Sequence, residues 1–344
     1  MSSEMPAIDR LGVAVGLRTL GALDMAELAQ AAERTGLSRF VAMEAWRETI
    51  VPLSACALRT ERIGLATGVM QVFPVNPVMV ALQASELQEL SGGRFTLGLG
   101  VGAAFVVPRW FGVPYEKPMT RIREFLEIVR GVHESAGSSP FSYDGELFGI
   151  RKYSLGDEPV RPVPLHIAAV GPKMQELAGE LADGVMVGAL HSAEHLGDVR
   201  ERLAVGAARA GRAAAGIEIS YHLVAACDQD GDRARSLARR SISYCTQYPH
   251  YLKRFAAEGF GAQAEQIGQL VRRHENDSAE AQVTDAMLER FAVAGTPAEC
   301  REQLRPHLSG DAVPILTLFP FRVSEQEVMA SHHLLLKELG TLGA

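Results

Sequence analysis

Eight short apolar segments, separated by segments of helical periodicity, constrain the fold of this 344-residue chain more than any other feature. Within each of the eight, apolar residues run almost continuously, as in parallel strands that are covered on both faces. Half-buried antiparallel strands would instead alternate apolar and polar residues. The eight predicted strands are 11–15, 39–43, 63–69, 94–101, 164–170, 184–187, 217–226 and 312–319.

Two architectures accommodate such strands with right-handed crossovers: a closed eight-stranded barrel and an open, doubly wound sheet. The count of eight favours the barrel. An open sheet would normally carry a Gly-x-Gly-x-x-Gly dinucleotide motif after its first strand. Here the first strand is followed by Gly16-Leu17-Arg18-Thr19, which does not match. We therefore predict the α/β class, as a (β/α)8 TIM barrel.

The segments between the strands show the apolar spacing of helices. Asp24 is predicted as the N-cap of the first helix and Gly36 as its end. Pro77 suits the first turn of the third helix. The predicted helical segments are 24–35, 49–59, 77–90, 119–135, 174–181, 193–210, 232–244, 248–274 and 284–293.

Two stretches interrupt the even spacing of the barrel units. The first, at 137–162 after the fourth helix, contains Asp144-Gly145 between two short β-prone runs, which predicts a hairpin turn. The second, at 227–311, follows the seventh strand and is largely helical. Long insertions on a barrel usually build its mouth. We assign both to one domain that spans residues 1–344.

Composition excludes several classes of protein. The chain has 41 acidic residues against 34 Lys and Arg, a net charge of −7, whereas nucleic-acid binders usually need a basic face. No stretch has the length of a membrane span, and the N-terminus has no signal-peptide pattern. We expect a cytoplasmic protein with neither a membrane nor a nucleic-acid partner. No metal site is expected, since the four cysteines lie far apart: Cys56, Cys227, Cys245 and Cys300.

The C-terminal ends of barrel strands carry the active site in this fold. Here those ends are rich in glycine and hold no convergent nucleophile, lysine or paired carboxylates, which argues against a hydrolase or an aldolase. Glycine lets a flat ligand approach the backbone and leaves N–H groups free to hold phosphate. Each glycine taken singly is explained by a turn, but together they favour a planar cofactor.

Two blocks of sequence carry a family resemblance. The first comprises residues 60–69 (TERIGLATGV) and 90–100 (LSGGRFTLGLG), and the second residues 164–174 (PLHIAAVGPKM) with Ala182-Asp183-Gly184. In both, the chain resembles the bacterial luciferase-like monooxygenase superfamily. The resemblance implies a (β/α)8 barrel, an oxidoreductase activity, and a flavin or the deazaflavin coenzyme F420 as cofactor.

Within that superfamily, residues 110–118 (WFGVPYEKP) with Arg121 and Arg123-Glu124-Phe125 are most similar to the branch that uses coenzyme F420. The block at 164–174 is similar to methylene-tetrahydromethanopterin reductases. F420 is therefore the expected cofactor, and FMN, which uses the same barrel mouth, is the alternative.

The resemblance also assigns cofactor contacts. Family members often hold a non-proline cis peptide at the end of the third strand, where Gly68–Val69 lies here, and it would support the ring. The loop from Val170 to Lys173 matches the segment that holds the phosphate-bearing tail at a helix N-terminus. Pro172 has no N–H group, so Gly171 and either Lys173 or Met174 would donate. The expected cofactor-binding residues are Thr67, Gly68, Val69, Gly100, Val101, Gly102, Ala169, Val170, Gly171, Pro172, Lys173 and Gly188.

The substrate side departs from the sugar-phosphate dehydrogenase branch of the superfamily. Ala103 stands where that branch has an acidic Glu, and Glu44 is the only carboxylate in place of its Asp-His pair. We therefore expect an apolar or aromatic substrate and Glu44 as the catalytic acid or base. The expected substrate-binding residues are Trp46, Phe105, Trp110 and His191, and a lid is expected from Tyr244, Tyr248, His250 and Tyr251.

The expected function is an F420-dependent oxidoreductase that transfers a hydride between the reduced deazaflavin and a small, largely apolar organic substrate. An FMN-dependent luciferase-like monooxygenase is one alternative, and a non-catalytic cofactor-binding protein is the other. Because the apolar helix at 77–90 carries few charges, a homodimer that pairs through it is also expected.

Overall fold

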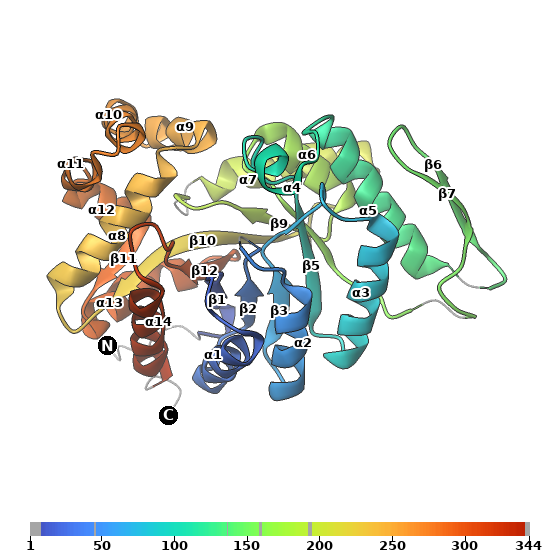
Figure 1. The fold of residues 1–344 in the computed structure, drawn as a ribbon, viewed down its shortest axis with the longest axis horizontal. Coiled ribbons are helices and arrows are strands. Elements are labelled where there is room, and N and C mark those ends of the chain that lie inside the picture. Colours follow the sequence, from blue (N-terminus) through green and yellow to red (C-terminus); the bar gives the residue numbers. More distant parts are fainter. Residues whose placement is uncertain (1–7, 45, 136, 158–159, 192–194, 341–344) are drawn as a thin grey trace.

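The computed structural model describes residues 8–44, 46–135, 137–157, 160–191 and 195–340. Eight parallel strands close into a barrel in which every strand pairs with two neighbours, so the predicted (β/α)8 fold is confirmed (Figure 1). In ring order the strands are β1 (Gly12–Val15), β2 (Arg39–Ala42), β3 (Gly64–Thr67), β5 (Phe95–Gly100), β8 (Leu165–Ala168), β9 (Gly184–Val187), β10 (Glu218–Cys227) and β12 (Val313–Thr317).

Helices surround the ring. The helices that follow the barrel strands are α1 (Ala22–Thr35), α2 (Ile50–Arg59), α3 (Pro77–Leu90), α5 (Pro118–Glu134), α6 (Pro172–Leu181), α7 (Leu196–Arg209), α8 (Gly231–Cys245) and α14 (Glu325–Gly340). The remaining helical elements are η1 (Ile8–Arg10), α4 (Val107–Phe111), α9 (Pro249–Ala257), α10 (Gly261–Arg272), α11 (Asn276–Ala281), α12 (Asp285–Phe291) and α13 (Pro297–Leu308). Among the described helices none is long and apolar enough to cross a membrane.

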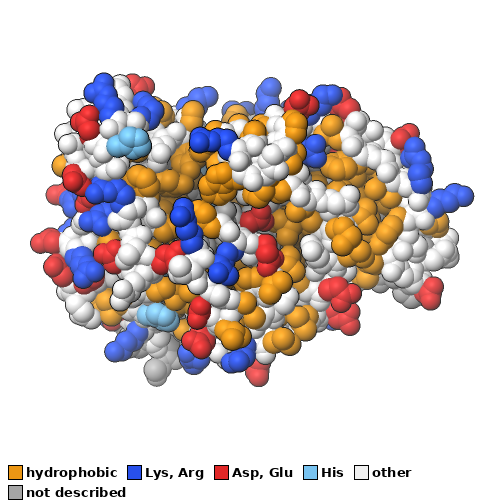
Figure 2. All heavy atoms as spheres, viewed as in Figure 1, with side chains coloured by type: hydrophobic (Ala, Val, Ile, Leu, Met, Phe, Trp, Pro, Cys, Tyr) orange, Lys and Arg blue, Asp and Glu red, His pale blue; other side chains and the backbone are white. Residues whose placement is uncertain are grey.

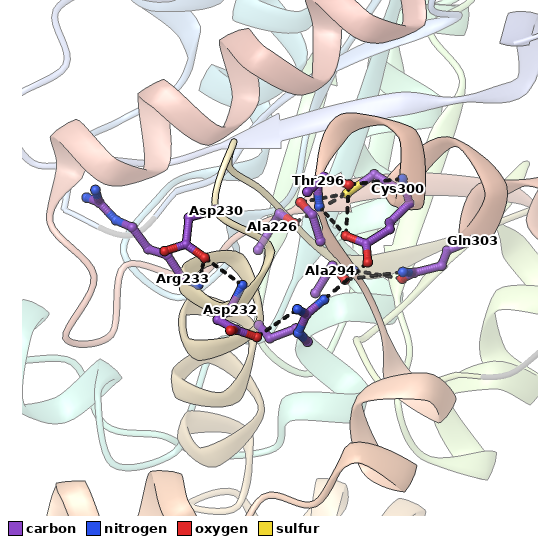
Figure 3. Close-up of polar contacts among 11 residues, drawn as sticks. Ala226, Asp230, Asp232, Arg233, Ala294, Thr296, Cys300 and Gln303 are labelled. Carbon is purple, nitrogen blue, oxygen red and sulfur yellow. Dashed lines mark hydrogen bonds and ion pairs between the residues drawn. The ribbon is translucent and has the colours of Figure 1, made fainter.

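Two short strands extend the barrel sheet. β4 (Met70–Gln71) follows the cis peptide between Gly68 and Val69 and pairs with the end of β5. β11 (Ala292–Gly295) pairs with residues 224–227 of β10, beyond the residues of β10 that pair with β9. The open edge of β11 is covered by Gln303, whose side chain accepts from the N–H of Ala294 at 2.9 Å and donates to its carbonyl at 3.2 Å (Figure 3). An edge protected in this way is less available to pair with another chain.

The inside of the barrel changes in character from one end to the other. At the N-terminal end, Arg39 and Glu218 form an ion pair, and His166 lies 3.8 Å from the same carboxylate. Above them is a small apolar layer. The C-terminal end of the barrel is the end that carries the active site in this fold. The buried members of the apolar layer are Ala14, Val41, Ala66, Met186 and Ile315.

The hairpin predicted at Asp144-Gly145 is present and is fixed to the barrel by one carboxylate. β6 (Phe141–Asp144) and β7 (Gly149–Tyr153) pair antiparallel. The buried side chain of Glu124 in α5 accepts hydrogen bonds from the backbone N–H groups of the turn, residues 146–148, at 2.7–3.0 Å. Glu124, which the sequence offered only as part of a family motif, thus orders the first insertion.

Most of the helix ends predicted from local signals are confirmed. Gly36 ends α1 with φ of +91°, and α3 runs from Pro77 to Leu90 as predicted. The N-cap assigned to Asp24 is wrong, because the cap residue is Gly21. Asp24 lies three residues later, and its carboxylate accepts the N–H of Gly21 at 2.8 Å.

The second insertion differs from its prediction in two places. The helix predicted at 284–293 ends at Phe291, and Val293 lies in β11, a strand that sequence reasoning missed. The segment 248–274 forms two helices, α9 and α10, because Gly259 interrupts it with φ of +85°. Part of the start of the helix predicted at 193–210 lies outside the described residues.

Candidate active site

The cis peptide between Gly68 and Val69 places the Val69 side chain against the end of β5. A Cβ atom added to Gly100 would lie 2.5 Å from Cγ2 of Val69. Gly102, with φ of +66°, has Oε1 of Gln71 at 2.3 Å from the equivalent position. The space beside these two glycines is thus filled by protein side chains, so Val69 rather than Gly100 offers the contact surface at this part of the mouth.

Three other predicted cofactor residues serve packing. The Thr67 hydroxyl donates to the carbonyl of Gly98 at 2.7 Å and accepts from its N–H at 2.8 Å, so this side chain is already committed to the barrel. A Cβ at Gly68 would meet Val41 at 2.2 Å, and one at Gly188 would meet the Tyr251 hydroxyl at 2.5 Å. At both glycines a neighbouring side chain occupies the space that a Cβ atom would take, so a ligand cannot approach the backbone from that side.

Gly171 differs from the other glycines, because no atom lies within 4 Å of the position that its Cβ would occupy. It precedes α6, and no side chain caps this helix. The N–H of Met174 donates to the Gly171 carbonyl at 3.1 Å. Of the two residues expected to donate beside Gly171, Lys173 and Met174, only Lys173 therefore keeps its N–H group available. An uncapped helix N-terminus presents free N–H groups and the positive end of the helix dipole to an anion.

The loop before α6 is held by Gln175, which the sequence analysis overlooked. Its side-chain amide donates to the carbonyls of Ala169 and Val170 at 3.3 and 3.4 Å. These carbonyls are therefore directed back into the protein. A polar residue on the buried face of an otherwise apolar helix was the available signal for this role.

Glu44 follows β2 and lies at the same end of the barrel. Burial raises the pKa of its carboxyl from the usual range to about 7, and the nearby charge of Glu48 acts in the same direction. A hydrogen bond from the backbone N–H of Gln71 opposes them. A carboxyl with such a pKa can take up or release a proton near neutral pH, as a general acid or base must.

Aromatic side chains form a wall on the side of α8 and α9. Tyr244 and Tyr248 share a hydrogen bond between their hydroxyls at 2.6 Å, and Tyr244 has its ring centroid 6.0 Å from that of Phe319, after β12. Tyr248 lies 6.0 Å, centroid to centroid, from Phe105 after β5. The Tyr251 hydroxyl accepts from the N–H of Ala189 after β9 at 3.0 Å. The wall thus connects the second insertion with three barrel strand ends.

The other predicted substrate residues are placed differently. Trp46 is 40% exposed and lies beneath the guanidinium of Arg18, 4.7 Å from its carbon, while Trp110 on α4 is 54% exposed. His191 is buried, and no hydrogen bond from the described residues reaches either ring nitrogen. Burial, assisted by the charge of Arg254, lowers the pKa of His191 to about 3, so the ring is neutral. Only Phe105 among the four joins the aromatic wall.

His222 is a mouth residue that sequence reasoning missed. It lies on β10 in register with Ile315 of β12, its side chain is partly exposed, and its Nδ1 is 2.7 Å from the Thr317 hydroxyl. Its ring is 6.5 Å from that of Phe319. Polar residues at alternate positions of the seventh strand, Ser220 and His222, were the available signal, because alternate residues of a strand face the same side.

Similar proteins are known both by sequence and by structure. A 5,10-methylenetetrahydromethanopterin reductase from Archaeoglobus fulgidus is 32% identical over 256 residues, covering 73% of this chain and 75% of the relative. The coenzyme F420-dependent tetrahydromethanopterin reductase from Methanopyrus kandleri superposes with a TM-score of 0.80 at 22% identity, covering 98% of both chains. An FMN complex of the oxygenating constituent of 3,6-diketocamphane monooxygenase from Pseudomonas putida gives 0.63 at 15% identity, covering 96% of this chain and 98% of that one.

The two structural matches show the shared barrel, and the sequence match covers most of the chain. The family model of the luciferase-like monooxygenases matches residues 11–309, which include all but one of the barrel strands and most of the second insertion. The chain therefore belongs to the luciferase-like monooxygenase family.

Proposed function

We propose that this protein is a coenzyme F420-dependent oxidoreductase that transfers a hydride between the reduced deazaflavin and a small, largely apolar organic substrate. The observation that carries the proposal is the open, uncapped N-terminus of α6 at Gly171, which lies at the strand ends together with the titratable Glu44 and the aromatic wall. The similarity to the coenzyme F420-dependent reductase from Methanopyrus kandleri supports the choice of cofactor.

The described residues fit such a cofactor. The N–H groups of Gly171 and Lys173 would hold the phosphate of the tail, and the exposed Lys173 side chain adds a positive charge. Val69 would support the ring, because its side chain fills the end of β5 above Gly100. When bound, the deazaflavin supplies a ring carbon that accepts or donates the hydride.

Residues of the chain would supply the proton and hold the substrate. Glu44 would hold the proton that accompanies hydride transfer, at a carboxyl whose pKa lies near 7. Phe105, Tyr244 and Tyr248 would exclude water and hold an apolar substrate against the ring. Ala103 leaves the loop after β5 without the acid that a sugar-phosphate activity would use.

An FMN-dependent monooxygenase is the second candidate, because the FMN complex from Pseudomonas putida has the same barrel. Oxygen would then be the co-substrate and an apolar molecule the acceptor. A non-catalytic cofactor-binding protein is the third candidate. Whichever applies, we propose that the partners of the chain are a small-molecule substrate and a second copy of itself.

The test is a pair of fluorescence titrations of the purified protein with F420 and with FMN, followed by turnover of the reduced cofactor on a panel of acceptors. Binding of F420 with turnover is the expected result. Micromolar binding of FMN without binding of F420 would overturn the choice of cofactor. Binding of a cofactor without turnover on any acceptor would favour the non-catalytic alternative.

A further inference from the structure

His222 and Thr317 form a hydrogen-bonded pair at the mouth that none of the roles above uses. Nδ1 of His222 and the Thr317 hydroxyl oxygen are 2.7 Å apart, and the same hydroxyl lies 3.1 Å from the carbonyl of Ile315. The two residues come from adjacent strands, β10 and β12. Phe319 and Tyr244, members of the aromatic wall, lie directly beyond them.

Both contacts are hydrogen bonds at the same time in only one tautomer of the neutral imidazole. The carbonyl of Ile315 can only accept, so its hydrogen bond with Thr317 uses the single hydroxyl proton. In that arrangement the hydroxyl oxygen accepts from His222, whose Nδ1 carries the hydrogen. In a neutral ring the other nitrogen, Nε2, is left with its lone pair as an acceptor.

Nothing in the described part of the chain uses that acceptor. Among the described residues, only Thr317 forms a hydrogen bond with the His222 ring. Nε2 makes none, and it does not belong to the fully buried polar atoms that lack a partner. Burial lowers the pKa of His222 to about 4, so the ring stays neutral and keeps its lone pair at physiological pH.

We propose that Nε2 of His222 accepts a hydrogen bond from an O–H or N–H group of the substrate. The site would then select apolar or aromatic molecules that carry a hydroxyl or an N–H group close to the reacting carbon. Thr317 is a positioning residue, because it acts only by holding the imidazole in the Nδ1–H tautomer. This inference rests on the proposed function, which makes the mouth the substrate site.

The tautomer is measured without any ligand. Protein labelled with ¹⁵N-histidine is examined by NMR at neutral pH, and the His222 signals are assigned by their loss in His222→Gln. We expect a protonated Nδ1 and an unprotonated Nε2 in the natural protein and in Thr317→Ser, which keeps the hydroxyl. In Thr317→Val we expect the proton to shift to Nε2. A protonated Nε2 in the natural protein would overturn the inference.

Selection is measured with two matched probes titrated into the F420-loaded protein: indole, whose N–H group can donate but not accept, and indene, which lacks that group. One neutral hydrogen bond corresponds to a preference of about two- to tenfold for indole. We expect this preference in the natural protein and in Thr317→Ser, and its loss in Thr317→Val. An equal preference in all three would overturn the role of His222. Failure of F420 to bind at all would instead count against the proposed function, while the NMR result would still decide the tautomer.

Discussion

Glu44 accepts a hydrogen bond from the backbone N–H of Gln71, which joins the loop after β2 to β4. Gln71 lies two residues beyond Val69, so the carboxyl is fixed close to the cis peptide at the barrel mouth. Burial outweighs this hydrogen bond, because the pKa of Glu44 is raised to about 7 although the N–H group favours the ionised form. Glu44 is thus an acid whose protonation state changes near neutral pH.

Glu44→Gln should lower turnover by about 10²- to 10⁴-fold, the usual worth of general acid–base assistance, while the affinity for the cofactor changes less than tenfold. If Glu44 donates the proton during substrate reduction, the rate of the natural enzyme should fall as the pH rises through about 7. Steady-state kinetics across this pH range, with F420 titrations in parallel, measure both effects. Loss of affinity without loss of turnover would make Glu44 a cofactor contact.

The same substitution has a consequence for stability that does not depend on catalysis. A carboxyl whose pKa is higher in the folded state than in the unfolded chain favours folding while it is protonated, and this advantage is lost as the pH rises from the usual pKa of 4.5 to about 7. Glu44→Gln should therefore be more stable than the natural protein at pH 8, by about 1–3 kcal/mol, and nearly equal to it at pH 4. Urea denaturation at both values measures this, with the exposed Glu89→Gln as a control that should show no such dependence.

The barrel could be predicted from the sequence because its signals are local. Each strand is a continuous apolar run, and the bounds of α3 follow from Pro77 and the apolar spacing up to Leu90. β11 was missed because its four residues, 292–295, directly follow a helix and pair with the far half of β10. Such a pairing depends on residues almost 70 positions away and leaves no local pattern.

The candidate site could be predicted only as far as the strand ends. The fold places Gly100 and Gly102 at these ends. It does not reveal that Val69 and Gln71 fill the space beside the two glycines. Which neighbour occupies the space beside a glycine depends on the register between strands. The register between strands also places the Thr67 hydroxyl against Gly98, where it hydrogen-bonds to the backbone N–H and carbonyl.

Gly171→Val should weaken F420 binding at least tenfold, or about 1.4 kcal/mol, because the side chain would occupy the open space over the start of α6. The substitution should leave the fold intact, since φ at this position is −97° and no atom is nearby. Gly149→Val is a matched control, as that glycine in β7 is equally open but lies in the hairpin. An unchanged dissociation constant in folded Gly171→Val would remove this residue from the cofactor site.

The outer faces of α2 and α3 should pair two copies of the chain. Leu58 on α2 is 71% exposed and Met79 on α3 is 55% exposed, and Figure 2 shows hydrophobic side chains gathered over these helices. Apolar surface of this kind is typical of protein interfaces. Analytical ultracentrifugation at tens of micromolar should give twice the monomer mass of 37.1 kDa, and Leu58→Glu should give monomers. Val205→Glu, on the exposed face of α7, should remain dimeric, and a monomeric natural protein would refute the interface.

Glu124 should determine whether the hairpin of β6 and β7 stays ordered. Its carboxylate is only 4% exposed and accepts from the backbone N–H groups of residues 146–148, which form the turn. Glu124→Gln replaces one accepting oxygen by a donor, so at least one of these N–H groups loses its partner, at a cost of about 1–3 kcal/mol. Hydrogen exchange of the hairpin amides should accelerate, while that of the barrel strands should change little. Glu134→Gln, an exposed residue at the end of the same helix, is the control and should leave the hairpin protected. Equal protection of the hairpin in Glu124→Gln would mean that its own strand pairing, rather than this carboxylate, maintains the first insertion.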